Sequence, residues 1–123
     1  MNILVFDAPD ATFKKVAQEE IEKFLKKHSL NSQIAVSVFF VSPAKIKELN
    51  GKYRKIDQST DVLSFPVWKE KSEIPTEGEV SLGDIFICLS ELAKNAQEKK
   101  IENTEELAFL VDHGLCHLIG KHH

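Results

Sequence analysis

The stretch VSLGDIFICLSELAKNAQEKKIENTEELAFLVDHGLCHLIGKHH, residues 80–123, decides the fold class. Residues 80–88, VSLGDIFIC, are mostly apolar and are predicted to form a strand, the fourth in the chain. A helix is predicted to follow from about Ser90 to Lys100. A second helix is predicted after it, because six residues form a broad apolar face: Leu107, Leu110, Val111, Gly114, Leu115 and Leu118. The strand needs partners from earlier in the chain.

Two signals set the ends of the last predicted helix. Asn103 is followed three residues later by Glu106, which is the spacing of a capping box. Gly120 comes directly after the apolar face and is placed to end the helix.

Three apolar segments upstream are predicted as the other strands. They are residues 2–7, 33–41 and 61–68. Pro66 interrupts the third segment and favours an edge position or a strand end, because proline cannot donate a hydrogen bond to a sheet. The charged residues 69–79 are expected to form an exposed loop.

Two further helices separate these strands. Asp10 is the predicted N-cap of an amphipathic helix that ends at about His28. His28 itself is expected to be a surface residue or a C-terminal capping residue. A shorter helix is predicted to begin at Pro43, with Ser42 as its N-cap. Strands and helices interleave at short, uneven intervals, so we expect a single α+β domain over residues 1–123, built around a small sheet.

The composition is that of a soluble globular protein, with 42% hydrophobic and 28% charged residues. No apolar run approaches the roughly 20 residues of a membrane helix. The N-terminal residues lack the features of a secretory signal, so a cytoplasmic location without membrane partners is expected. Cys88 and Cys116 are then expected to be reduced thiols. The net charge of -3 means that RNA binding would need a local basic surface.

Four of the five histidines lie in the last eleven residues. His113 and His117 are four residues apart on the predicted helix, so their rings project from one face in reach of a single ion. Beyond Gly120 the chain can turn back, and His123 can supply a third imidazole, although only its spacing favours it over His122. Three imidazoles leave an open position, which is typical of catalytic zinc sites; Zn²⁺ is favoured over nickel, copper and iron.

The histidine cluster has two other interpretations. The histidines could be ordinary helix residues followed by a tag-like end, but the paired spacing, the glycine and the third ring together favour a metal site. The spacing also occurs in metzincin proteases, where HExxHxxGxxH includes a glutamate as general base. Gly114 occupies that position here, so a peptidase is disfavoured.

A second polar cluster spans residues 50–66, NGKYRKIDQSTDVLSFP. Arg54 carries a fixed, planar charge suited to a phosphate group. Thr60 and Asp61 could cap or cross-link the entry to the following strand. On composition alone, a well-bonded loop with solvated lysines is the favoured interpretation.

Three segments together resemble the signature blocks of the YbeY family of bacterial metal-dependent endoribonucleases. They are N-x-x-YR-x-x-D-x-x-TDVLSFP (50–66), LGDIFI (82–87) and HGLCHLIGKHH (113–123). The blocks stand in the family's order, and the resemblance covers about residues 33–123. It implies a function in ribosomal RNA maturation and ribosome quality control. It also implies an α+β fold with a small, mostly parallel sheet of about four strands and a metzincin-like metal site on the C-terminal helix.

The resemblance also assigns roles to residues. It implies His113, His117 and His123 as ligands of one divalent ion, and Arg54 as the arginine that works in RNA cleavage. Three further residues are candidates for orienting or structural roles: Asp61, Asp84 in the LGD turn, and His122.

This chain departs from the family pattern HGxLHLxGYDH at three positions. Cys116 replaces a leucine and is expected to pack in the core. Lys121 replaces the tyrosine, and His122 replaces an aspartate that could orient a ligand or relay a proton. The sequence also ends on His123, where a family member continues; either the chain is truncated or its terminal carboxylate lies close to the metal.

The expected reaction is single-strand RNA cleavage, with metal-bound water or hydroxide attacking phosphorus and Arg54 sharing the developing charge. A route through the ribose 2′-hydroxyl is equally open. The expected partners are a ribosomal RNA precursor and, from the family, ribosomal proteins, but not DNA. Two basic segments could bind phosphates: Lys14, Lys15, Lys23, Lys26 and Lys27, and then Lys52, Arg54 and Lys55. For the five lysines of the first segment, a solvated helix face is the favoured interpretation. The alternatives are a metallopeptidase-like hydrolase and a non-catalytic RNA-binding or ribosome-binding factor with a structural metal.

Overall fold

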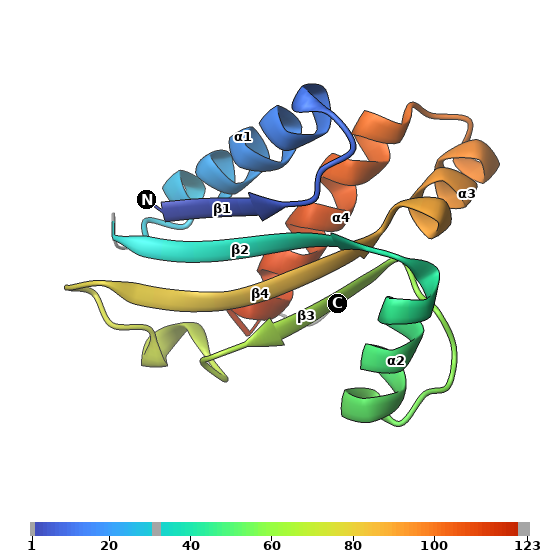
Figure 1. Ribbon diagram of the computed structural model, residues 1–123. Helices are drawn as coiled ribbons and strands as arrows, with labels where there is room; N and C mark the ends of the chain where they lie inside the picture. Colours follow the sequence, from blue (N-terminus) through green and yellow to red (C-terminus); the bar gives the residue numbers. More distant parts are fainter. Residues whose placement is uncertain (1, 31–32, 121–123) are drawn as a thin grey trace.

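A computed structural model describes residues 2–30 and 33–120 of the chain. Four strands form one sheet, and four helices pack around it (Figure 1). In chain order the elements are β1 (Asn2–Phe6), α1 (Ala11–Lys27), β2 (Ile34–Val41), α2 (Pro43–Arg54), β3 (Val62–Pro66), the short 3₁₀ helix η1 (Lys71–Glu73), β4 (Val80–Cys88), α3 (Leu89–Lys99) and α4 (Asn103–Leu118). Each strand and helix predicted from the sequence is present, with ends shifted by one or two residues at most sites.

The sheet has the strand order β1-β2-β4-β3. β1, β2 and β4 are parallel, whereas β3 runs antiparallel to β4 at the edge of the sheet. Parallel neighbours need long crossover connections, which here include helices. The predicted mostly parallel, four-stranded α+β fold is therefore confirmed, and Pro66 ends an edge strand as expected.

The two faces of the sheet are covered unequally (Figure 1). α1 and α4 bury one face, and the core there contains Ile34, Val36, Val38, Ile85 and Ile87 from the sheet with Ile21, Leu25, Leu107, Leu110 and Leu115 from the helices. α2 covers only part of the other face, where Ile46 packs with Leu63 and Cys88. Over β1 that face is open, since Leu4 is 43% and Phe6 is 41% exposed.

The predicted caps of the first two helices are present. The Asp10 carboxylate accepts a hydrogen bond from the Phe13 N–H at 2.9 Å, and α1 begins directly after Asp10. The Ser42 hydroxyl accepts one from the Lys45 N–H at 3.1 Å, ahead of the helix that begins with proline. His28 is the C-cap residue of α1, as expected. Local sequence therefore fixes both helix starts.

The capping box predicted at the start of α4 is wrong. Asn103 is already helical and Glu102 is the cap residue, and among the described residues no side chain caps this end. Glu106 is 1% exposed, and its Oε1 atom accepts from Lys99 Nζ of α3 at 2.7 Å. The carboxylate faces α3 and the core, so it cannot turn back to the helix start. The other end agrees with expectation, because Gly120 follows the C-cap residue with φ +81°.

A β-bulge interrupts β4 at Leu82, where the register against β2 shifts by one residue. Leu82 and Ile85 consequently both lie in the core under α1 and α4. Asp84 lies between core-facing neighbours and points to the opposite face, away from α4. The LGD segment is thus a bulge inside a strand and not the turn that we expected.

Candidate metal centre and substrate site

The two described histidines of the C-terminal cluster lie side by side on α4. Their ring centroids are 4.7 Å apart, and the ring planes are inclined by 62°. Both residues are half-buried, so the rings lie at the surface of the domain without being fully solvated. His113 and His117 can therefore present a nitrogen each to one ion from successive helical turns.

The rest of the predicted ligand set lies outside the described residues. His122 and His123 both fall there, as does Lys121, and the role of His123 as third ligand stays a prediction. Within residues 2–30 and 33–120, no group of three His, Cys, Asp or Glu side chains forms a metal cluster. Two imidazoles at this spacing fit a zinc-type ion, for which nitrogen ligands are typical.

Gly114 holds the histidine-bearing turn close to the sheet. A Cβ atom at this position would lie 3.1 Å from both Ile85 Cδ1 and Ser64 Oγ, which is tighter than ordinary contact. α4 thus packs closely on β3 and β4 between the two histidines. A glutamate here, as in the metzincin motif, would press on the Ser64 and Ile85 side chains, which would have to shift.

An aromatic ring and an ion pair support His113 from the side of α3. The Phe109 ring lies one turn earlier on α4, 6.2 Å from the His113 ring and inclined by 21°. Lys99 Nζ stands 4.1 Å from the centroid of Phe109 and also binds Glu106. Lys99 and Phe109 were not predicted from the sequence, and Glu106 was predicted only as part of a capping box; the four-residue spacing of Phe109 before His113 was the available signal.

Arg54 is the last residue of α2, and its side chain is exposed. The loop behind it is held by Asn50, whose side-chain amide donates to the Gln58 carbonyl at 2.9 Å. α2 packs on the opposite face of the sheet from α4. Arg54 and the histidine pair are therefore carried on opposite faces of the sheet, and both α2 and α4 pack against the edge strand β3.

Asp61 is tied into the scaffold at the entry to β3. Its Oδ2 atom accepts from Asn95 Nδ2 of α3 at 2.9 Å, and Oδ1 accepts from Thr60 Oγ1 at 3.3 Å. Its carbonyl also accepts from the Cys88 N–H at 3.0 Å. These bonds cross-link the start of β3 to α3, which is a structural role.

Asp84 lies on the face of the sheet that α4 does not cover. Its cross-strand neighbours are Ser37 and Phe65. Partial burial raises the pKa of the Asp84 carboxyl above its usual range. The structure does not bring Asp84 next to the histidine pair.

Both cysteines have buried thiol groups. Cys116 is 8% exposed and belongs to the core under α4, as predicted for a residue that replaces leucine. Cys88 packs on the other face with Ile46 and Leu63. The two sulfur atoms thus belong to clusters on opposite faces of the sheet.

Comparison with known proteins decides the family. The model of the family described as "Endoribonuclease YbeY" matches residues 5–123. This chain belongs to the YbeY family. The match covers all three segments from which the sequence analysis drew the resemblance, and that prediction is confirmed.

Proteins named Endoribonuclease YbeY from several bacteria are similar to this YbeY chain. The one from Treponema denticola is 38% identical over 118 residues, covering 95% of this chain and 76% of the relative. The one from Caldicellulosiruptor bescii is 34% identical over 120 residues, covering 93% and 76%. The one from Limosilactobacillus reuteri is 34% identical over 135 residues, covering 100% and 85%.

The fold agrees with a solved structure as well. The solution structure of TM1509 from Thermotoga maritima matches this YbeY chain with a TM-score of 0.66 and 31% sequence identity, over 98% of this chain and 74% of that one. Family membership places the chain among nuclease hydrolases and not among peptidases. In the part of the chain that the structure describes, no helix is both long and apolar enough to cross a bilayer.

Proposed function

We propose that this chain is a metal-dependent, single-strand-specific endoribonuclease that acts in ribosomal RNA maturation and ribosome quality control. The observation that carries the proposal is the pair of half-buried imidazoles on α4, 4.7 Å apart, in a chain of the YbeY family. We assign the ion to His113, His117 and His123, with Zn²⁺ as the preferred metal. A cytoplasmic location and contacts with ribosomal proteins belong to the same proposal.

The histidines would hold the ion against the edge of the domain. Once bound, a divalent ion supplies Lewis acidity and an activated water at neutral pH. Phe109, which the ion pair of Lys99 with Glu106 adjoins, would orient the His113 ring toward the ion. Gly114 keeps the same turn of α4 in contact with β3 and β4.

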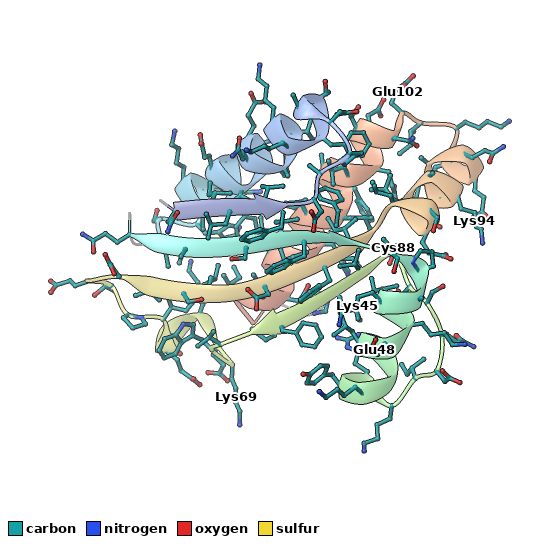
Figure 2. The ribbon with its side chains drawn as sticks, in the orientation of Figure 1. Lys45, Glu48, Lys69, Cys88, Lys94 and Glu102 are labelled. Atoms are coloured by element: carbon teal, nitrogen blue, oxygen red, sulfur yellow. The ribbon has the colours of Figure 1, made fainter. Side chains whose placement is uncertain are left out.

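Arg54 would bind the non-bridging oxygens of the scissile phosphate. Its guanidinium can donate two parallel hydrogen bonds to a phosphate, and these strengthen as negative charge grows during the reaction. Among the described residues no carboxylate forms an ion pair with Lys52, Arg54 or Lys55. By contrast, Lys45 pairs with Glu48, both labelled on α2 in Figure 2, and Lys47 pairs with Asp57. The end of α2 therefore provides a local basic surface on an acidic chain.

Removal of the metal is expected to abolish cleavage. Purified protein should contain about one equivalent of zinc by elemental analysis. Dialysis against EDTA should stop the cleavage of a labelled, unstructured RNA, and added Zn²⁺ should restore it. RNA that still binds the stripped protein, with no cleavage under any metal condition, would instead indicate a non-catalytic RNA-binding factor.

Arg54→Ala is expected to lower the cleavage rate by about 100-fold, the usual loss when one group that stabilises transition-state charge is removed. The thermal unfolding midpoint should stay unchanged, because the side chain is exposed. Arg54→Lys should recover only part of the rate, since lysine cannot form the bidentate contact. Lys47→Ala is the control on the same helix, because Lys47 is already paired with Asp57 at 3.8 Å. Equal rates for wild type and Arg54→Ala would remove Arg54 from the site.

A further inference from the structure

Five aromatic side chains form a continuous row on the face of the sheet that α1 and α4 leave uncovered. In spatial order they are Phe6 on β1, Phe39 on β2, Phe86 on β4, Phe65 on β3 and Tyr53 on α2. Successive ring centroids lie 4.7, 4.8, 5.6 and 5.2 Å apart. The row thus crosses all four strands and ends at the helix that carries Arg54.

The aromatic row is accessible to solvent, unlike the aliphatic core on the other face. Phe6 is 41% and Tyr53 is 56% exposed, while Phe39, Phe65 and Phe86 are half-buried. Figure 2 shows side chains standing on this face, with no helix over β1 and β2. A partly exposed row of this length is unusual on a domain surface and favours a binding role.

The orientation of the rings determines what can bind. The rings of Phe6, Phe39 and Phe86 are almost parallel, with interplanar angles of 10° and 13°, so they form a stack. Within the stack the ring faces cover one another, and the ring edges point outward from it. A ring face is available at the outer end, on Phe6. At the other end Phe65 and Tyr53 are turned edge to face. A flat ligand can therefore stack at either end and lie across the edges between them.

Positive charge lies at one end of the aromatic row, where it can bind the phosphates of a single-stranded nucleic acid. Lys52 Nζ lies 5.2 Å from the Tyr53 ring, and Arg54 follows on the same helix end. The face itself carries Asp84, between Ser37 and Phe65, which can accept a hydrogen bond from a base amino group but would repel a phosphate. Phosphates are thus favoured at the α2 end, and bases on the sheet.

The edge strand β3 connects this face with the histidine pair. Ser64 lies against the Gly114 turn of α4, and the next residue, Phe65, belongs to the aromatic row. A single RNA strand that passes around the edge at β3 can contact both faces of the sheet over a short length of RNA.

We propose that the aromatic row binds unpaired bases of the substrate RNA next to the scissile phosphate; this site rests on the proposed endoribonuclease function. Because every base has an aromatic face, such binding tolerates sequence but requires single-stranded RNA. The aromatic row extends the site beyond the metal and Arg54.

The test compares binding of an unstructured oligouridine with binding of an abasic ribose-phosphate oligomer of the same length, in EDTA so that no cleavage occurs. Wild type should prefer the oligouridine. Phe6→Leu and Tyr53→Leu should each weaken oligouridine binding by about five- to tenfold and leave abasic binding unchanged. Tyr53 lies on an exposed helix face, so its variant is expected to fold even if Phe6→Leu does not.

Leu4→Ala is the matched control, because Leu4 is exposed on the same face of β1 but has no aromatic ring. Its oligouridine affinity should equal that of wild type. Lys52→Gln should weaken both oligomers equally and reduce the salt dependence.

Three outcomes would overturn the proposed base-binding row. They are wild-type affinity in both Phe6→Leu and Tyr53→Leu, an equal loss in Leu4→Ala, and a wild-type dimer in sedimentation that Phe6→Leu converts to a monomer. In the last case a second copy, and not RNA, covers the face. If any of these results is found while cleavage still depends on His117, the base-binding row is contradicted and the proposed nuclease function is retained. If binding is selective for bases but no metal-dependent cleavage occurs, the nuclease function is contradicted and the base-binding row is retained.

Discussion

Replacing His117 by alanine is expected to remove the bound metal and to lower RNA cleavage by about a thousandfold, since a catalytic metal contributes several kcal/mol to the transition state and each 1.36 kcal/mol is tenfold in rate. His117 is the central ligand of the predicted set, with its ring 4.7 Å from that of His113. Metal content by elemental analysis and single-turnover cleavage of a labelled RNA measure the two effects. Affinity for the same RNA in EDTA should not change.

His28→Ala is the control for the loss of a histidine as such. His28 is the C-cap residue of α1, its ring lies 4.2 Å from that of Phe24, and it is not one of the proposed ligands, so metal content and cleavage should both be retained. The same assay tests the third ligand: His123→Ala should behave like His117→Ala, whereas His122→Ala should keep the metal. A full equivalent of metal and a wild-type rate in His117→Ala would contradict the proposed centre.

Part of the candidate site could be predicted from the sequence because its geometry is local. Two residues four apart on a helix share a face whatever surrounds the helix, and His113 and His117 do so here. Arg54 and the histidines are different. They lie on helices that cover opposite faces of the sheet, and only the strand order reveals that relationship. Hydrophobic patterns predict strands but not their order in the sheet, so the position of Arg54 relative to the histidines could not be predicted.

The predictions for two acidic residues, Glu106 and Asp84, were wrong for the same reason: their positions depend on tertiary packing. Glu106 fitted a capping box by spacing, but packing of α3 on α4 supplied Lys99 as a competing partner. Asp84 was assigned to an LGD turn, whereas it follows a bulge inside β4. One extra residue in a strand reverses the face of every side chain beyond it. The bulge therefore moved Asp84 to the side of the aromatic row, and tertiary pairing determined its position.

Gly83→Ala is expected to lower the free energy of unfolding by about 3 kcal/mol or more, the largest stability effect of a single methyl group that we predict in this chain. Gly83 has φ +137°, a conformation that residues with a side chain rarely adopt. An added Cβ would also lie 2.4 Å from the Phe65 carbonyl oxygen and 2.9 Å from Leu118 Cδ2. The oxygen belongs to the backbone of β3, so the edge strand itself would have to move. Chemical denaturation of both proteins measures the difference.

Gly78→Ala separates the conformational cost of positive φ from the steric cost of the added Cβ. Gly78 also has positive φ, +79°, but a Cβ there meets no atom within 4 Å, so only the conformational cost of about 1 kcal/mol applies. If Gly83→Ala cost no more than Gly78→Ala, the close approach of β3 to β4 would not be rigid. If the prediction holds, the displaced edge strand should also lower RNA cleavage in any folded Gly83→Ala protein. That loss is expected because β3 carries Ser64 against the histidine-bearing turn on one side and Phe65 toward Tyr53 and α2 on the other.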